Sequence, residues 1–296
     1  MTTARTSAGV ERVVPVRRQM EGGGFSVRRP FPASGMDQVD PFLLLDEMGP
    51  ADYGPGEAVG APDHPHRGFE TVTYMLEGVF EHADSAGHRG RIAPGDVQWM
   101  TAGDGVIHSE MPSREILRDG GRIHGFQLWV NLPARDKRMR PRYQELSSRD
   151  IPKVSTPDGL ARVVVIAGSA LGVSAAIDTR IPILFHDWTV LPGGSADLEL
   201  PDGFRAFAYV FSGSVRLGSD GREVGEGQMA LLSPGQLLEI RKPALDMDTA
   251  RFLVLGAVPL REPMVRYGPF VMNTRREIEE AFEDYQAGRM GMIPAA

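Results

Sequence analysis

The sequence predicts an all-β protein built from two antiparallel β-barrels and followed by one α-helix. Two observations carry this prediction. Turn residues interrupt residues 69–108 at intervals of about eight to twelve, as in antiparallel sandwiches and barrels, and a later stretch of the chain repeats the pattern. The 296 residues include 35 glycines and 23 prolines, which favours short strands, and this length is enough for two domains.

The first domain is expected to contain consecutive short strands. The apolar run FLLLDEMG follows the turn dipeptide Asp40-Pro41 and reads as a buried strand, and HGFQLWVNLP forms another from His124 onward. Turns such as Glu77-Gly78 and Pro94-Gly95-Asp96 separate the segments between them. The strands expected in this interval cover residues 69–76, 78–83, 90–95, 97–102 and 105–111.

Two pairs of potential metal ligands lie in this domain, His64 with His66 and His108 with Glu110. Residues i and i+2 of a strand share a face, so each pair can direct both side chains into one cavity. The 42 positions from His66 to His108 leave room for strands that return the second pair beside the first. A divalent ion would satisfy all four groups, each of which would cost about 1–3 kcal/mol if buried without a partner. The spacing therefore predicts a metal site.

An internal repeat predicts a second domain of the same design. Residues 203–213 match residues 68–78 at a shift of 135, and Gly227 falls opposite Gly95 at a shift of 132. Applied to the four candidate ligands, in order, these shifts give Glu199, Pro201, Ile240 and Lys242. We therefore expect the second domain to lack the metal site.

The domain boundary is expected near a charged segment with five basic residues, which runs from Arg135 to Arg142. We interpret this segment as a solvated connection, with a docking patch as the alternative. The predicted domains are residues 1–134, which bind the metal, and residues 135–296, which include the terminal helix.

Charge and composition exclude several classes of function. The net charge of −7 repels polyphosphate, so direct nucleic-acid binding is not expected. With no cysteine in the chain, a metal must accept nitrogen and oxygen donors. No apolar run approaches the length of a membrane span or a signal peptide core, and we expect a cytoplasmic protein without membrane contact.

The C-terminal region predicts one helix. Thr274 can cap its start, and Glu277 completes a capping box three residues later. Ile278, Ala281, Phe282 and Tyr285 form an apolar stripe that ends before Gly288, so the helix should pack on a barrel.

Four long motifs closely resemble the pirin family, a branch of the cupin superfamily. They are HPHRGFETVTYMLEG, GDVQWMTAGDGVIHSEMP, GFQLWVNLP and GPFVMNTRREIEEAFEDYQAGRMG. The likeness runs from about Arg12 to Gly291. It implies a bicupin, in which two jelly-roll β-barrels pack face to face and one metal, usually iron, lies in the N-terminal barrel. It also implies four ligands, namely His64, His66, His108 and Glu110.

Two positions depart from the family pattern. Ala61 stands where a bulky residue is common, and Asp104 stands in a motif that commonly reads AGRG. We expect both positions near the cavity entrance, so the family's substrate preference does not transfer directly.

The resemblance implies a quercetin 2,3-dioxygenase-like enzyme that cleaves an aromatic flavonol with dioxygen. Four protein ligands leave two positions open on an octahedral ion, as catalysis requires. We expect one divalent ion, iron(II), with manganese, nickel, cobalt, copper and zinc as alternatives. We hypothesise that Glu110, besides ligating the metal, receives the proton of the substrate hydroxyl.

The alternative function is a non-enzymatic iron and redox sensor that modulates a protein partner in transcription or metabolism, as pirins also do. A monomer is expected under either function. Glu70 is a further candidate ligand, although a structural hydrogen bond is the favoured interpretation. The other histidines and three large apolar side chains are expected to be structural: His82, His88, His124 and His186, and Met75, Trp99 and Met100.

Overall fold

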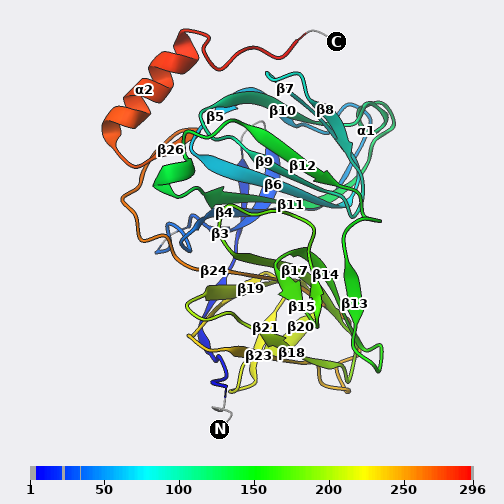
Figure 1. Cartoon of the computed structure of the whole chain (residues 1–296). Coiled ribbons are helices and arrows are strands. Elements are labelled where there is room, and N and C mark those ends of the chain that lie inside the picture. The colour runs from blue at the N-terminus through cyan, green and yellow to red at the C-terminus, as the bar shows by residue number, and fades with distance from the viewer. Residues whose placement is uncertain (1–4, 22–23, 34, 295–296) are drawn as a thin grey trace. The chain divides into compact units, whose positions relative to one another are not determined.

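A computed structural model describes residues 5–21, 24–33 and 35–294 and confirms the predicted all-β class (Figure 1). Every strand pair in the described part of the chain is antiparallel, apart from isolated bridges. The chain forms two compact units, which we call the N-terminal and C-terminal barrels. None of the described helices is both long and apolar enough to cross a membrane.

The N-terminal barrel comprises residues 18–148 and the segment from 260 onward. Its large sheet has seven strands in the order β12 (Arg142–Leu146), β9 (Val97–Thr101), β6 (Phe69–Glu77), β11 (Gly121–Asn131), β4 (Phe42–Tyr53), β3 (Phe25–Phe31) and β2 (Arg18–Glu21). Its small sheet has the order β5 (Ala61–His66), β10 (Val106–Pro112), β7 (Phe80–Asp84) and β8 (Arg89–Ile92). The remaining elements are the hairpin β25 (Val265–Tyr267) and β26 (Phe270–Met272), and the helices α1 (Arg114–Asp119), η1 (Ala134–Asp136) and α2 (Arg275–Gln286).

The C-terminal barrel comprises residues 1–17 and 149–259. Its large sheet has the order β1 (Val10–Pro15), β22 (Gln228–Leu232), β19 (Arg205–Ser212), β24 (Ala250–Ala257), β17 (Ile183–Val190), β14 (Ala161–Ala167) and β13 (Lys153–Ser155). Its small sheets are formed by β18 (Ser195–Glu199), β23 (Leu237–Arg241), β20 (Ser214–Leu217) and β21 (Arg222–Gly225), and by the pair β15 (Ser169–Ala170) and β16 (Val173–Ser174).

The two barrels share one strand order and one register, as the internal repeat predicts. In the N-terminal barrel Val72 lies opposite Trp99, and at the predicted shifts Phe207 lies opposite Leu231 in the C-terminal barrel. A repeat read from eleven-residue matches therefore extends to the pairing of whole strands.

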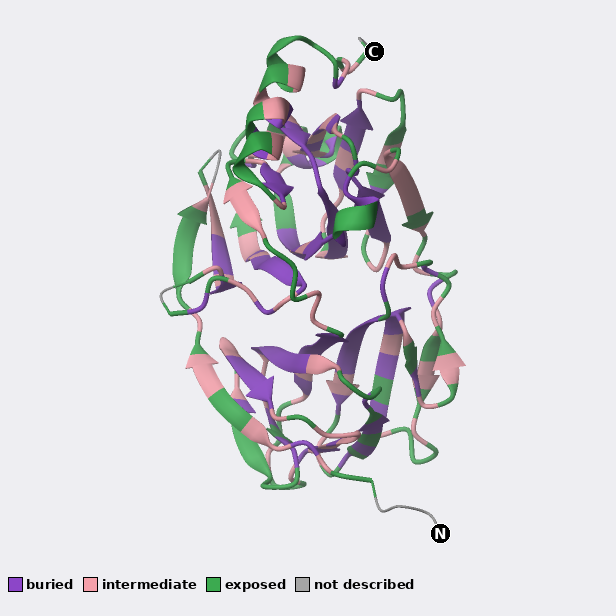
Figure 2. Ribbon diagram, turned by 60° about the vertical axis from the view of Figure 1, so that its left-hand side comes forward, coloured by how far each residue is buried: buried purple, intermediate pink, exposed green. Residues whose placement is uncertain are grey.

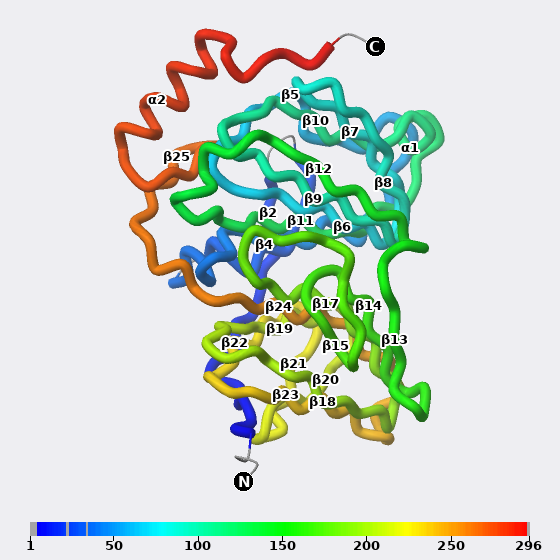
Figure 3. Tube along the Cα trace, viewed as in Figure 1, coloured from blue at the N-terminus to red at the C-terminus, as the bar shows by residue number. Residues whose placement is uncertain are grey.

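The compact units do not follow the predicted division at residue 134. The strand beside β9 is β12, from within the predicted second domain, whereas the equivalent strand beside β22 is β1, from the start of the chain. Figure 3 shows this blue N-terminal segment beside strands of the C-terminal barrel and the orange-red terminal segment beside the N-terminal barrel. The physical reason is long-range strand pairing, which residue patterns along the chain do not encode.

In the charged segment that we interpreted as a solvated connection, Arg135, Arg138 and Arg140 are exposed, but Lys137 packs into the N-terminal barrel. Lys137 is buried, and its ammonium donates hydrogen bonds to Gly68 O, Asn131 Oδ1 and Val271 O at 2.7–2.9 Å. Burial lowers the pKa of Lys137 to about 8. Lys137 therefore links elements of the N-terminal barrel, which the basic pattern of the segment did not predict.

The terminal helix forms as predicted. Thr274 and Glu277 make the reciprocal capping box at the start of α2. Ile278 and Ala281 are buried, while most of the helix surface is exposed, as the green stretches of Figure 2 show. The helix contacts the N-terminal barrel, because Arg67 forms an ion pair of 2.7 Å with Asp284.

Candidate metal centre

Strand β10 positions the second pair of predicted ligands. Buried and half-buried residues alternate along the whole strand, with His108 and Glu110 on the buried face, as the spacing of two predicts. Strand β5 lies alongside, and its register places His64 opposite His108. A bulge follows, since Glu110 pairs with Ala61, and such bulges redirect side chains.

Three of the four predicted ligands form a cluster that could hold a metal ion. The ligand atoms of His64, His66 and His108 all lie within 4.8 Å of one another. The Nε2 atoms of His64 and His66 are 3.1 Å apart, and the ring of His108 lies 4.4 Å and 4.9 Å from theirs, between centroids. The histidines therefore converge on one point.

Backbone carbonyls orient two of these rings. His64 Nδ1 lies 2.7 Å from Pro62 O, and His66 Nδ1 lies 3.4 Å from Pro269 O. Each contact favours a proton on Nδ1 and leaves Nε2 free to bind a metal. Both nitrogens of His108 are buried and have no hydrogen-bond partner among the described residues. Since buried polar atoms are normally paired, a bound metal ion would satisfy one of these nitrogens.

Two of the histidines, His66 and His108, are held in the neutral form that metal binding requires. Burial, together with the neighbouring His64, places the pKa of His66 well below its ordinary range. Burial also places the pKa of His108 well below that range, with His66 and His64 adding to the effect. The imidazoles of His66 and His108 can therefore present lone pairs at neutral pH.

Glu110 lies beside this cluster but is engaged with other residues. Its Oε1 accepts a hydrogen bond of 2.6 Å from the Thr73 hydroxyl, and its Oε2 lies 3.4 Å from Gln127 Nε2. The cluster defined by mutual ligand distances contains the three histidines only. Ligation by Glu110 therefore stays a prediction.

A cavity of about 170 Å³ opens at the cluster. His64, His66 and Glu110 line it, together with Trp129 and residues from β2, β3, β4, β6 and the terminal hairpin. Ala61 also lines the cavity as expected. Asp104 does not; it faces Arg138 at 3.3 Å and Arg67 at 3.9 Å instead. The expectation that Asp104 lies at the entrance was therefore wrong.

Comparison with known proteins identifies the family. Residues 24–130 match Pirin, and residues 185–291 match the Pirin C-terminal cupin domain. The chain belongs to the pirin family. It is 44% identical to a pirin-like protein of Solanum lycopersicum, over 95% of this chain and 92% of that one. It is 42% identical to human pirin, over 93% and 91% of the two chains.

A solved structure supports the same assignment. The quercetin 2,3-dioxygenase of Acinetobacter baumannii is 36% identical and has a TM-score of 0.89, with 97% of this chain and 99% of that chain covered. Both barrels of this pirin are therefore cupin domains, as the resemblance implied.

Three other histidines of this pirin have carboxylate partners, in keeping with their structural interpretation, whereas His186 is buried without a carboxylate partner among the described residues. His82 pairs with Glu145 at 2.5 Å, His88 with Asp84 at 2.8 Å, and His124 with Glu47 at 2.9 Å. Glu70 accepts a hydrogen bond of 2.6 Å from Thr101. It lies on the face of β6 opposite to Thr73, because the two residues are three positions apart in the same strand. Ligation by Glu70 therefore has no support.

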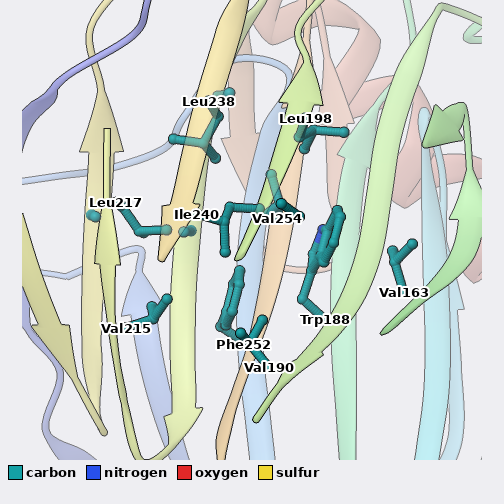
Figure 4. Packing of buried hydrophobic residues seen from close by; sticks show 14 of the residues in the cluster. Val163, Trp188, Val190, Leu198, Val215, Leu217, Leu238, Ile240, Phe252 and Val254 are labelled. Carbon is teal, nitrogen blue, oxygen red and sulfur yellow. The ribbon is translucent and has the colours of Figure 1, made fainter. Parts of the chain in front are cut away.

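The C-terminal cupin of this pirin has an apolar interior at the equivalent place. Ile240 pairs with Ala196 as His108 pairs with His64, and Leu238 pairs with Leu198 as Val106 pairs with His66. Figure 4 shows Leu198, Leu238 and Ile240 within this apolar core.

Register corrects the sequence alignment of the first ligand pair, which had matched Glu199 and Pro201. Two residues connect β5 to β6, but five connect β18 to β19. The three additional residues account for the two different shifts. The conclusion that the second cupin lacks the histidines still holds.

Sequence reasoning missed Thr73, Gln127 and Pro269. Thr73 and Gln127 lie opposite each other on the largely buried strands β6 and β11. Polar residues on the inward face of such strands could have indicated them. Pro269 gives no such signal, because its contact joins residues 203 positions apart.

Proposed function

We propose that this pirin is a metal-dependent dioxygenase that cleaves a flavonol such as quercetin with dioxygen. The observation that carries the proposal is the cluster of His64, His66 and His108 at the wall of a cavity. The name of the Acinetobacter relative supports this choice of reaction. We further propose iron(II) as the metal and Glu110 as the fourth ligand.

The residues present fit such a group. His108 has two buried nitrogens without partners among the described residues, and the set of imidazole and carboxylate donors suits divalent iron. When bound, the ion would supply open positions for a substrate oxygen and dioxygen and would lower the pKa of the substrate hydroxyl.

Glu110 has the surroundings of a proton acceptor. The Thr73 hydroxyl donates a hydrogen bond to Oε1 of its carboxylate and holds the side chain in place beside the histidines. Since Oε1 is engaged by Thr73, the more weakly held Oε2 is available to receive a proton.

The cavity walls orient the substrate and exclude water. The ring of Trp129 lies 5.2 Å from the ring of His66, between centroids. Met48, Phe80 and Ile123 add apolar surface around the same cavity. An aromatic substrate would therefore find flat apolar contacts beside the histidines.

The direct test is to load the purified protein anaerobically with iron(II) and mix it with quercetin and dioxygen. We expect loss of the flavonol absorbance, uptake of one dioxygen and release of one carbon monoxide for each quercetin. Parallel loading with manganese, nickel, cobalt, copper and zinc identifies the active metal. Absence of decay with every metal would contradict the proposal and favour the regulatory alternative.

The role of Glu110 has its own test. Glu110→Gln keeps the shape of the side chain but cannot accept the proton, so we expect turnover to fall by about 10²-fold or more. Metal content, measured by elemental analysis, should fall much less. If metal and activity decline in proportion, Glu110 acts as a ligand and not as a base. The predicted monomeric state, cytoplasmic location and regulatory protein partner are separate proposals that this experiment does not address.

A further inference from the structure

Arg266 lies in the wall of the metal cavity, one aromatic ring away from the histidines. It belongs to strand β25, in the segment that returns to the N-terminal barrel after residue 259. Its guanidinium carbon lies 4.8 Å from the centroid of the Trp129 ring. The same ring makes an edge contact with His66, at 5.2 Å between centroids. Trp129 therefore separates a fixed cation from the candidate metal.

The charges around the cavity are unevenly paired. Arg29 makes two hydrogen bonds of 2.6 Å to Asp46 and an ion pair of 2.8 Å to Glu21. Arg266 has no carboxylate within 4.0 Å among the described residues, and its hydrogen bond goes to Leu43 O at 3.3 Å. The cavity therefore contains one arginine in direct ion pairs, and a second that the same two carboxylates, Glu21 and Asp46, reach only at longer range.

This environment is unfavourable for the Arg266 cation. Burial lowers the pKa of Arg266 below its ordinary value, and the nearby Arg29 adds to this effect, which outweighs the opposing attraction of Glu21 and Asp46. The guanidinium lies over the ring of Trp129, and its hydrogen bond to Leu43 O leaves most of its donors without a partner among the described residues. A planar fork of this kind matches a carboxylate or another delocalised oxyanion.

We propose that Arg266 binds an anionic group of the substrate, so that the natural substrate carries two acidic ends. One end is an enol or phenol oxygen directed at the histidines. The other is a carboxylate or ionised phenol that Arg266 receives across Trp129. This inference rests on the proposed function, because it places the substrate in the cavity beside the metal, and it narrows the substrate class to anionic aromatic compounds.

The test compares three probes under anaerobic conditions, in which turnover cannot occur. They are 3-hydroxyflavone and its derivatives with a carboxylate at the 4′ or the 7 position. Dissociation constants are measured by flavonol fluorescence on the metal-loaded, full-length protein. A charge-assisted pair contributes about 1.5–3 kcal/mol, so we expect at least one carboxylate to bind about 10-fold or more tightly than the parent.

Two variants assign this preference to Arg266. Arg266→Met keeps an apolar stem on Trp129 and should reduce the preference to less than about 3-fold, with metal content and affinity for the parent nearly unchanged. Arg266→Lys keeps the charge without the fork and should fall between the two. Arg276→Met, on the exposed surface of α2, is the matched control and should behave as the wild type.

The inference is overturned if no carboxylate binds more tightly than the parent, if no probe binds, or if Arg266→Met retains the preference. These outcomes are separate from failure of the proposed function. An anion preference that depends on Arg266, in a protein that consumes no dioxygen with any metal, would refute the dioxygenase and leave the binding site. Quercetin turnover without that preference would support the dioxygenase and refute the anion site at Arg266.

Discussion

The two cupin barrels of this pirin have the same strand order and register but opposite interiors. His64, His66 and His108 in the N-terminal barrel correspond by register to apolar residues in the other. These residues are Ala196, Leu198 and Ile240, which are 7%, 1% and 0% exposed. The fold alone therefore does not make a metal site, and a small number of side chains decides between a centre and a core.

The difference extends beyond the ligands to the residues that support them. Thr73 and Gln127, which contact Glu110, correspond by register to Ala208 and Val254. Glu110 itself corresponds to a lysine, Lys242, whose ammonium lies 3.5 Å from Asp246. In the C-terminal barrel, apolar residues therefore replace the two polar residues that contact Glu110, and a positively charged lysine replaces Glu110 itself.

The largest effect is expected from a substitution that makes one barrel resemble the other. His108→Ile introduces the residue of the C-terminal barrel and removes one of three clustered ligands, so metal affinity should fall by about 100-fold or more. Metal content after dialysis measures the loss. His88→Gln, which changes a half-exposed histidine outside the cluster, is the control. Full metal content in His108→Ile would refute the assigned centre.

A substitution in the apolar core of the C-terminal barrel should lower stability without affecting the metal centre of the N-terminal barrel. Leu198→Ala leaves a cavity in the apolar interior and should lower the free energy of unfolding by about 2–5 kcal/mol. Metal content should not change. Scanning calorimetry measures the effect, and Leu245→Ala, at a site 93% exposed, should be nearly silent. Loss of metal from Leu198→Ala would show that the barrels are not independent in this respect.

Acid should destabilise the C-terminal barrel through His186. Burial lowers its pKa to about 4 from an ordinary value of 6.5. The unfolded chain therefore takes up a proton below about pH 6.5, and the folded chain does so only below about pH 4. The contribution is complete above pH 6.5 and falls by about 3 kcal/mol as the pH drops to 4.

His186→Leu should remove this part of the pH dependence, as denaturant titrations of the metal-free protein at pH 4.5 and 7 would show. His88→Gln serves again as the control. An identical pH slope in wild type and His186→Leu would contradict the assignment.

The smallest effect is expected from the support of Glu110. Thr73→Ala introduces the residue of the C-terminal barrel and removes a hydrogen bond of 2.6 Å. We expect metal affinity to fall by about 10-fold, because partners of this kind orient metal ligands. Thr73→Ser retains the hydroxyl and should restore most of the affinity. Equal losses in both variants would attribute the effect to packing rather than to the hydrogen bond.

Local patterns predicted much of this molecule correctly. The alternation in β10 placed His108 and Glu110 on one face, and the capping box at Thr274 fixed the start of α2. Both features depend on residues within a few positions of one another. The short helix α1 was missed, although Ser113 caps its first turn.

Long-range features were not predicted, for physical reasons. Strand β12 lies beside β9 in one barrel, whereas β1 takes the equivalent position beside β22 in the other. No periodic pattern in the sequence indicates this difference, and none indicates the contact of Pro269 with His66. The burial of Lys137 was missed because a basic run resembles a solvated surface until its backbone acceptors are known. Alignment of the first ligand pair failed by three residues because loop lengths differ between the barrels.

The return of the terminal segment to the N-terminal barrel has a consequence for biosynthesis. His66 receives its orienting carbonyl from Pro269, more than two hundred residues later in translation. A ribosome that has completed the first barrel's strands through β12 has therefore not yet delivered every part that surrounds the histidines. Metal acquisition with full affinity should accordingly require synthesis of the segment that contains Pro269, and products truncated before it should remain poorly metallated.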